Sequence, residues 1–178
     1  MSNRKAGVYD PGACSGGVSE ADVALQWALT LKWVLTRHGY QVWLTRDDDR
    51  DPDPVGSRDD RAEAAGCALF LSVHLNSADT PSARGVETFY RDSRDKELAA
   101  IVQQACLDAT GSKDRGLKTE GQSQHPRLAV FDFGGPCCLL EAGFVSNAAD
   151  RRAVTSRETR LAFAENLAQA LKRKFPPV

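Results

Sequence analysis

The chain has 178 residues, of which 42% are hydrophobic and 26% are charged, and its formal net charge at pH 7 is -1. A chain of this length typically forms one domain that buries roughly 70% of the surface exposed by the unfolded chain. The small net charge excludes general attraction to polyanions, so we expect an ordinary globular protein that binds no nucleic acid.

The N-terminal residues 1–5 lead into a short apolar segment, and no long apolar window follows anywhere in the chain. The sequence therefore predicts no signal peptide and no membrane insertion, for a protein that is made in the cytoplasm. Five cysteines, an odd number, then favour free thiols. Cys137 and Cys138 lie in an apolar run and are expected to pack as small core residues.

Strand-like and helix-like segments alternate in the first half of the chain. Apolar runs predict strands at 6–10, 41–45 and 68–74. Ser19 is the expected N-cap of a helix that ends at Gly39, and Ser57 is the expected N-cap of a short helix that ends near Gly66. The apolar residues of the first helix recur at helical spacing: Val23, Trp27, Leu31, Val34 and Leu35.

The second half continues the alternation. Apolar runs predict strands at 85–90, 128–131 and 137–141. Ser93 opens a helix that Gly111 ends, and residues 157–175 have the spacing of a final helix. Between them, residues 112–126 are polar and rich in Gly, Gln and Ser. We expect a long surface loop there, more mobile than the helices, that borders the functional site.

Strands that alternate with helices predict an α/β fold, with a mostly parallel central sheet sandwiched by helices. No internal repeat or linker divides the chain, so residues 1–178 are expected to form a single domain. Ligands of such folds bind beyond the carboxyl ends of the strands. Asp10, His74 and Glu141 stand at such ends, and Glu20 opens the helix that follows the first strand. The sequence therefore predicts that these four polar groups meet at one rim.

The residue types at this rim fit a hydrolytic metal site. A catalytic zinc ion takes three His, Asp or Glu ligands and acidifies a water at the fourth position. Glu20 and His74 suit the ligand roles, and Glu141 suits a base that passes the water's proton to the leaving amine. Taken singly, each has an ordinary structural role, as a helix N-terminal acid, a hydrogen-bonded histidine or a partner for arginine. Their joint placement favours the site.

Motifs along nearly the whole chain resemble those of one family, the zinc-dependent N-acetylmuramoyl-L-alanine amidases of the Amidase_3 type. The segments that carry the resemblance are 8–13, 45–46, 70–77, 85–90, 115–118 and 141–147. The resemblance implies that Glu20 and His74 bind zinc, that position 13 supplies the third ligand, and that Glu141 is the catalytic carboxylate. It also implies that the partner is peptidoglycan, cleaved at the amide between the lactyl group of N-acetylmuramic acid and L-alanine of the stem peptide.

Position 13 departs from the family pattern, in which a histidine follows Asp-Pro-Gly, because this chain has Ala13. Alanine cannot coordinate a metal, so we expect zinc binding to be weak or absent and this form to be inactive. The thiol of Cys14 is a poor substitute, because adjacent side chains usually point in different directions. The intact Glu20, His74 and Glu141 favour a deliberate histidine-to-alanine substitution, with a natural loss of activity as the alternative.

The resulting interpretation is a monomeric phage or prophage endolysin that acts on muramyl peptides of the cell wall after release from the cytoplasm. The alternative is a noncatalytic peptidoglycan-binding or regulatory module of the same fold. A nucleotide-binding protein has little support, since residues 12–17 lack both the Rossmann spacing and the Walker lysine.

Other polar residues are given structural interpretations. Glu87 is expected to serve the fold, and His125, in the polar loop, is expected to be solvated rather than a ligand. Four cations are candidates for the anionic stem peptide, although solvated or structural pairing is the expected role of each: Arg46, Arg58, Arg115 and Lys118.

Overall fold

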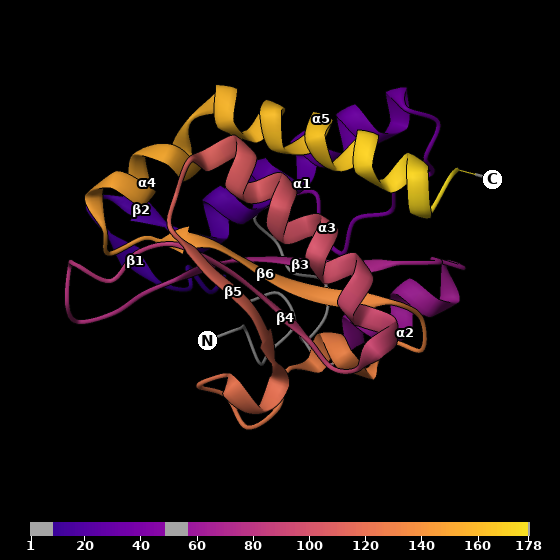
Figure 1. Ribbon diagram of the computed structural model, residues 1–178, viewed down its shortest axis with the longest axis horizontal. Coiled ribbons are helices and arrows are strands. Elements are labelled where there is room, and N and C mark those ends of the chain that lie inside the picture. The colour runs from indigo at the N-terminus through magenta and orange to yellow at the C-terminus, as the bar shows by residue number, and fades with distance from the viewer. Residues whose placement is uncertain (1–8, 49–56, 178) are drawn as a thin grey trace.

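The computed structural model describes residues 9–48 and 57–177 (Figure 1). Within these residues one sheet is formed by β3 Phe70–Asn76, β4 Val86–Tyr90, β5 Asp114–Thr119 and β6 Cys137–Phe144. The α-helices are α1 Glu20–Arg37, α2 Arg58–Ala64, α3 Ser93–Thr110, α4 Ala148–Thr155 and α5 Arg157–Lys174. The shorter elements are the paired strands β1 Cys14–Ser15 and β2 Val18–Ser19 and the 3-10 turns η2 Glu120–Gln122 and η3 Ala129–Asp132.

The four-stranded sheet has the order β3-β6-β4-β5. Strands β3 and β6 are parallel, β4 and β5 are parallel, and β4 runs antiparallel to β6. Helices flank this sheet, so the predicted single α/β domain with a mostly parallel sheet is confirmed, with one antiparallel junction that the alternation did not predict.

Each face of the sheet packs on a core of its own. One face carries Val86, Leu140 and Ala142, which pack against α1, α3 and α5, stacked on that side of the sheet in Figure 1. The opposite face carries Phe89 and Leu139, which pack in a smaller cluster with α2, η3 and the segment beside it. Because the second cluster is small, part of that face remains free to line a cleft.

Helix α1 begins where the sequence predicted. The side chain of Ser19 accepts a hydrogen bond from the backbone N–H of Asp22 at 3.2 Å, as an N-cap residue does. The buried Trp27 fixes the helix, because its Nε1 donates to the carbonyl of Val154 at 2.8 Å and its ring lies 4.9 Å from that of Phe163. The first residue of the helix, Glu20, is thereby held beside the sheet.

Two strands predicted in the first half are not formed. Residues 41–45 pair with no strand of the described part; the half-buried Val42 and Leu44 alternate with the exposed Gln41 and Trp43. Alternating apolar residues can cover a neighbouring surface without a hydrogen-bonded ladder, which explains the error. Of the strand predicted at 6–10, only the last two residues are described, and they are not in a strand.

Three differences occur in the second half. Residues 112–126, predicted as a loop, contain β5 and η2, because an edge strand with one exposed side tolerates polar residues. Residues 128–131, predicted as a strand, lie mostly in η3, where Val130 and Phe131 fill the smaller core without a strand partner. Helix α4 was not predicted; Asn147 caps it by accepting from two backbone N–H groups.

The thiols agree with the sequence prediction. All five cysteines are free, and Cys106, Cys137 and Cys138 are fully buried among apolar residues, whereas Cys14 is exposed. Burial raises the pKa of Cys137 to about 12, so its thiol stays protonated at neutral pH. Among the described helices, none is both long and apolar enough to cross a bilayer.

Candidate active site

The strand register places three of the polar residues in one row across the sheet. His74 of β3 lies opposite Glu141 of β6, which lies opposite Glu87 of β4. Paired residues of neighbouring strands point to the same face, so these side chains share the face that carries the smaller core. The row lies near the carboxyl ends of β3 and β6, the end of the strands at which ligands of α/β folds bind.

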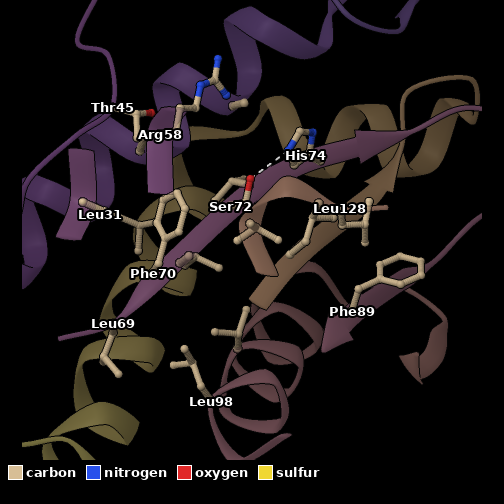
Figure 2. Close-up of a pocket in the computed structure, with 18 of the residues that line it drawn as sticks. Leu31, Thr45, Arg58, Leu69, Phe70, Ser72, His74, Phe89, Leu98 and Leu128 are labelled. Atoms are coloured by element: carbon tan, nitrogen blue, oxygen red, sulfur yellow. Dashed lines mark hydrogen bonds between the residues drawn. The ribbon is translucent and has the colours of Figure 1, made fainter. Parts of the chain in front are cut away.

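Glu20 and His74 form a direct pair. Oε1 of Glu20 lies 2.8 Å from Nδ1 of His74, and Nε2 of His74 lies 2.9 Å from Oγ of Ser72, the bond drawn in Figure 2. Burial opposes ionisation of both groups. Their mutual hydrogen bond and charges nevertheless hold the pKa of Glu20 below, and that of His74 above, its ordinary value.

The turn before α1 is shaped around the Glu20 carboxylate. Oε2 of Glu20 accepts the backbone N–H of Ala13 at 3.0 Å. At Gly12 the backbone has φ +64°, and a Cβ there would lie 2.5 Å from Oε2 of Glu20, so only glycine fits this close approach. Asp10 stabilises the same turn, because its Oδ1 accepts the N–H of Gly12 at 2.9 Å. Asp10 therefore serves the turn rather than a ligand role.

The backbone N–H of Ala13 contacts Glu20, and the methyl side chain of Ala13 offers no atom that could bind a metal. The thiol of Cys14 is exposed, 3.7 Å from the carbonyl of Gly12, and does not line the cleft described below. No group of three His, Cys, Asp or Glu side chains in residues 9–48 and 57–177 is placed to hold a metal ion. Because a catalytic zinc needs three protein ligands, Glu20 and His74 alone do not complete a site for it.

Glu141 is the buried acid of the site. Its Oε2 is inaccessible and has no hydrogen-bond partner among the described residues. Burial raises the pKa of Glu141 to about 8, helped by the charges of Glu20 and Glu87 and opposed by that of His74. Buried polar atoms are nearly always satisfied in folded proteins, so an unpartnered acid beside a cleft is a candidate for a functional position.

Glu87 is buried and paired on both oxygens. Oε1 accepts Nδ2 of Asn76 at 2.9 Å, and Oε2 accepts Nε of Arg115 at 2.8 Å. These partners make it a link between β3, β4 and β5, in agreement with the structural role expected from the sequence. Sequence reasoning named neither Ser72 nor Asn76. Their spacing of two residues from His74 was the available signal, since alternate residues of a strand share a face.

This row of side chains belongs to the lining of a cleft of about 1850 Å³, which extends beyond the row to apolar residues such as Leu31, Leu98 and Leu171. The site residues that line it are Ala13, Glu20, His74, Glu87, Arg115, Lys118 and Glu141. Residues 122–127 also line it, so the polar segment borders the cleft as predicted, with His125 exposed within it. Arg46 and Arg58 line the cleft as well; Arg46 donates to the carbonyls of Ala21 and Asp48, the structural pairing expected for it.

These features define an α/β domain with a histidine–carboxylate pair and a buried acid where its strands end at a cleft. The chain belongs to the Amidase_3 family of N-acetylmuramoyl-L-alanine amidases, whose sequence profile matches residues 6–173. This family is zinc-dependent in general.

Two curated relatives illustrate the membership. The chain is 31% identical over 177 residues to the endolysin of Bacillus phage SPP1, and the match covers 94% of this chain and 64% of the endolysin. It is 30% identical over 170 residues to the N-acetylmuramoyl-L-alanine amidase LytC of Bacillus subtilis, covering 93% of this chain and 32% of that enzyme. The chain thus spans between about a third and two thirds of the length of these relatives.

Solved structures show the same fold. The catalytic domain of the amidase CwlV from Paenibacillus polymyxa has a TM-score of 0.85 at 26% identity, with 98% of this chain and 96% of that chain covered. The amidase AmiC2 of Nostoc punctiforme has a TM-score of 0.82 at 29% identity, with 96% and 92% covered.

Proposed function

We propose that the chain is a single peptidoglycan amidase catalytic domain that cleaves the amide between N-acetylmuramic acid and L-alanine. The observation that carries the proposal is the convergence of Glu20, His74 and the unpartnered Glu141 on one cleft. In this assignment Glu20 and His74 are two of three zinc ligands, and position 13 is the third. With Ala13 the ligand set is incomplete, so the present form holds zinc weakly and does not turn over.

The role assigned to Glu141 follows from amide chemistry. The leaving amine must gain a proton, and the attacking water must lose one. Of the acids at the site, Glu20 bonds His74 at 2.8 Å and Glu87 bonds Asn76 and Arg115, whereas Oε2 of Glu141 has no hydrogen-bond partner in the described part of the chain. We therefore assign proton transfer to Glu141, while Ser72 orients the imidazole of His74 from its other ring nitrogen.

The similarity to the endolysin of Bacillus phage SPP1, which covers 94% of this chain, supports an endolysin that acts on the cell wall. The second candidate is a noncatalytic peptidoglycan-binding module. Ala13 is the observation that favours it, because a protein that only binds the wall has no need of the third ligand.

Restoring the ligand tests the two candidates. Ala13→His, incubated with zinc and purified peptidoglycan, is expected to release new L-alanine amino groups, and a chelator is expected to abolish the release. The matched control is Ala13→His with Glu141→Gln, which keeps the proposed ligands and is expected to be about 10²- to 10⁴-fold slower. A restored protein that takes up zinc but releases no amine would favour the binding module. Undiminished turnover in the control would refute the role of Glu141.

A further inference from the structure

Strand β5 contains an irregularity that changes which of its side chains reach the cleft. Val86 of β4 lies opposite Asp114, but the next residue, Glu87, lies opposite Gly116, so Arg115 is an extra residue in the ladder. Gly116, the next residue, has φ +81°, a backbone conformation that favours glycine. In a regular strand, residues three apart point to opposite faces. Because of the bulge, Arg115 and Lys118 both line the cleft.

Arg115 is paired within the protein. Its Nε lies 2.8 Å from Oε2 of Glu87, and its guanidinium lies 4.9 Å over the ring of Phe144. The other oxygen of Glu87 is held by Asn76. The charge of Arg115 is therefore neutralised, and its side chain is fixed between two strands.

Lys118 differs from every other Lys and Arg that lines the cleft in the described part of the chain. It is half-buried, yet its ammonium group has neither a hydrogen-bond nor an ion-pair partner there. Arg46 donates to backbone carbonyls, and Arg127 pairs with Asp132. Lys118 lies opposite Phe89, which lies opposite Leu139, so the surface of the sheet beside Lys118 is apolar. A cation over an apolar floor is poised to receive an anion.

The sheet also sets how far this cation lies from Glu141. Lys118 and Glu141 are two strands apart and in rows two residues apart on the same face. With strands about 4.8 Å apart and a rise of about 3.3 Å per residue, their Cα atoms lie about 12 Å apart. The flexible four-carbon stem of Lys118 covers part of this span, so an anion bound to Lys118 would lie one or two peptide residues from the bond at Glu141.

We propose that Lys118 binds a carboxylate of the stem peptide, the free α-carboxylate of the γ-linked glutamate that follows L-alanine. This assignment rests on the proposed function, since it places the scissile amide at Glu141. Amidation of that carboxylate removes the charge that Lys118 recognises. The residue therefore makes the domain selective for stem peptides whose glutamate is not amidated.

Equilibrium binding to the chain as it stands tests the proposal. The probes are two muramyl tripeptides, N-acetylmuramoyl-L-alanyl-γ-D-glutamyl-L-lysine and its α-amide, titrated by calorimetry. The parent is expected to bind the carboxylate form about tenfold tighter, the value of one charge-assisted hydrogen bond at a partly exposed site. Lys118→Gln is expected to bind both forms alike, and Lys118→Arg to keep the preference.

The matched control is Lys113→Gln, which removes an equal charge from an exposed position that does not line the cleft. It is expected to keep the parent's preference. Equal binding of both peptides by the parent, or an unchanged preference in Lys118→Gln, would overturn the assignment of Lys118 alone. Absence of binding of either peptide to the parent would overturn the proposed function and this inference with it.

Discussion

Glu141→Gln should raise the free energy of unfolding of the metal-free chain, and this increase should become larger as the pH rises. Burial raises the pKa of Glu141 from 4.5 to about 8. Below pH 4.5 the carboxyl is protonated in both the folded and the unfolded chain, so its ionisation does not affect the free energy of unfolding there. Between pH 4.5 and 8 the folded chain retains a proton that the unfolded chain releases. Stability therefore falls as the pH rises through this window and levels off above it.

The size of the effect follows from the two pKa values. A separation of about 3.5 units corresponds to an upper bound of about 5 kcal/mol in the free energy of unfolding. Glutamine has nearly the same shape and does not ionise, so the variant escapes this penalty. Urea unfolding at pH 5 and pH 8.5 measures the difference between variant and parent at each pH.

The control for this prediction is Glu97→Gln on the surface. Glu97 is 51% exposed and pairs with Lys174 at 2.8 Å, so its replacement should change stability by less than about 1 kcal/mol at either pH. A difference between Glu141→Gln and the parent that stays constant from pH 5 to 8.5 would refute the assignment of Glu141 as a buried, unpartnered acid.

Two further predictions concern the scaffold. Asp150 is fully buried and accepts hydrogen bonds from the backbone N–H groups of Gly85 and Phe144 at 2.7 and 3.0 Å. Asp150→Ala should therefore lower the free energy of unfolding, measured in urea, by about 3 kcal/mol or more. A loss below about 1 kcal/mol would show that these amides find other partners. In the native protein, the exposed Cys14 should react with a thiol reagent before Cys137, because burial raises the pKa of Cys137 to about 12 and leaves its thiol inaccessible. Mass spectrometry of the labelled peptides identifies the order of labelling. Early labelling of Cys137 would contradict its placement in the core.

Strands β3 and β6 and helix α1 were predictable from sequence because local and tertiary preferences agree there. The apolar run that becomes β6 is buried inside the sheet, the run that becomes β3 forms a half-buried strand beside it, and Ser19 caps α1 as its position indicates. The errors lie where the tertiary structure decides. Strand β5 is polar because it is an edge strand, and residues 128–131 are apolar because they fill a core as a 3-10 turn.

The convergence of Glu20, His74 and Glu141 at one cleft was predictable, but their contacts were not. The rule that ligands bind at the carboxyl ends of strands led to His74 and Glu141, and the register places them opposite one another. The sequence could not show that Glu20 bonds His74, because that contact joins residues 54 positions apart. It could not show that Arg115 and Lys118 share the cleft either, since only the bulge at Arg115 brings them to one face.

The central claim is that Glu20 and His74 are two ligands of a three-ligand zinc site that lacks its third ligand at position 13. Competition with a chromogenic chelator, applied to the parent and to Ala13→His, measures zinc affinity directly. We predict one zinc per chain in Ala13→His and an affinity for the parent at least about 100-fold weaker, since even loss of a group that only supports a ligand costs 10- to 100-fold. Tight stoichiometric zinc binding by the parent, or an unchanged weak affinity in Ala13→His, would contradict the account.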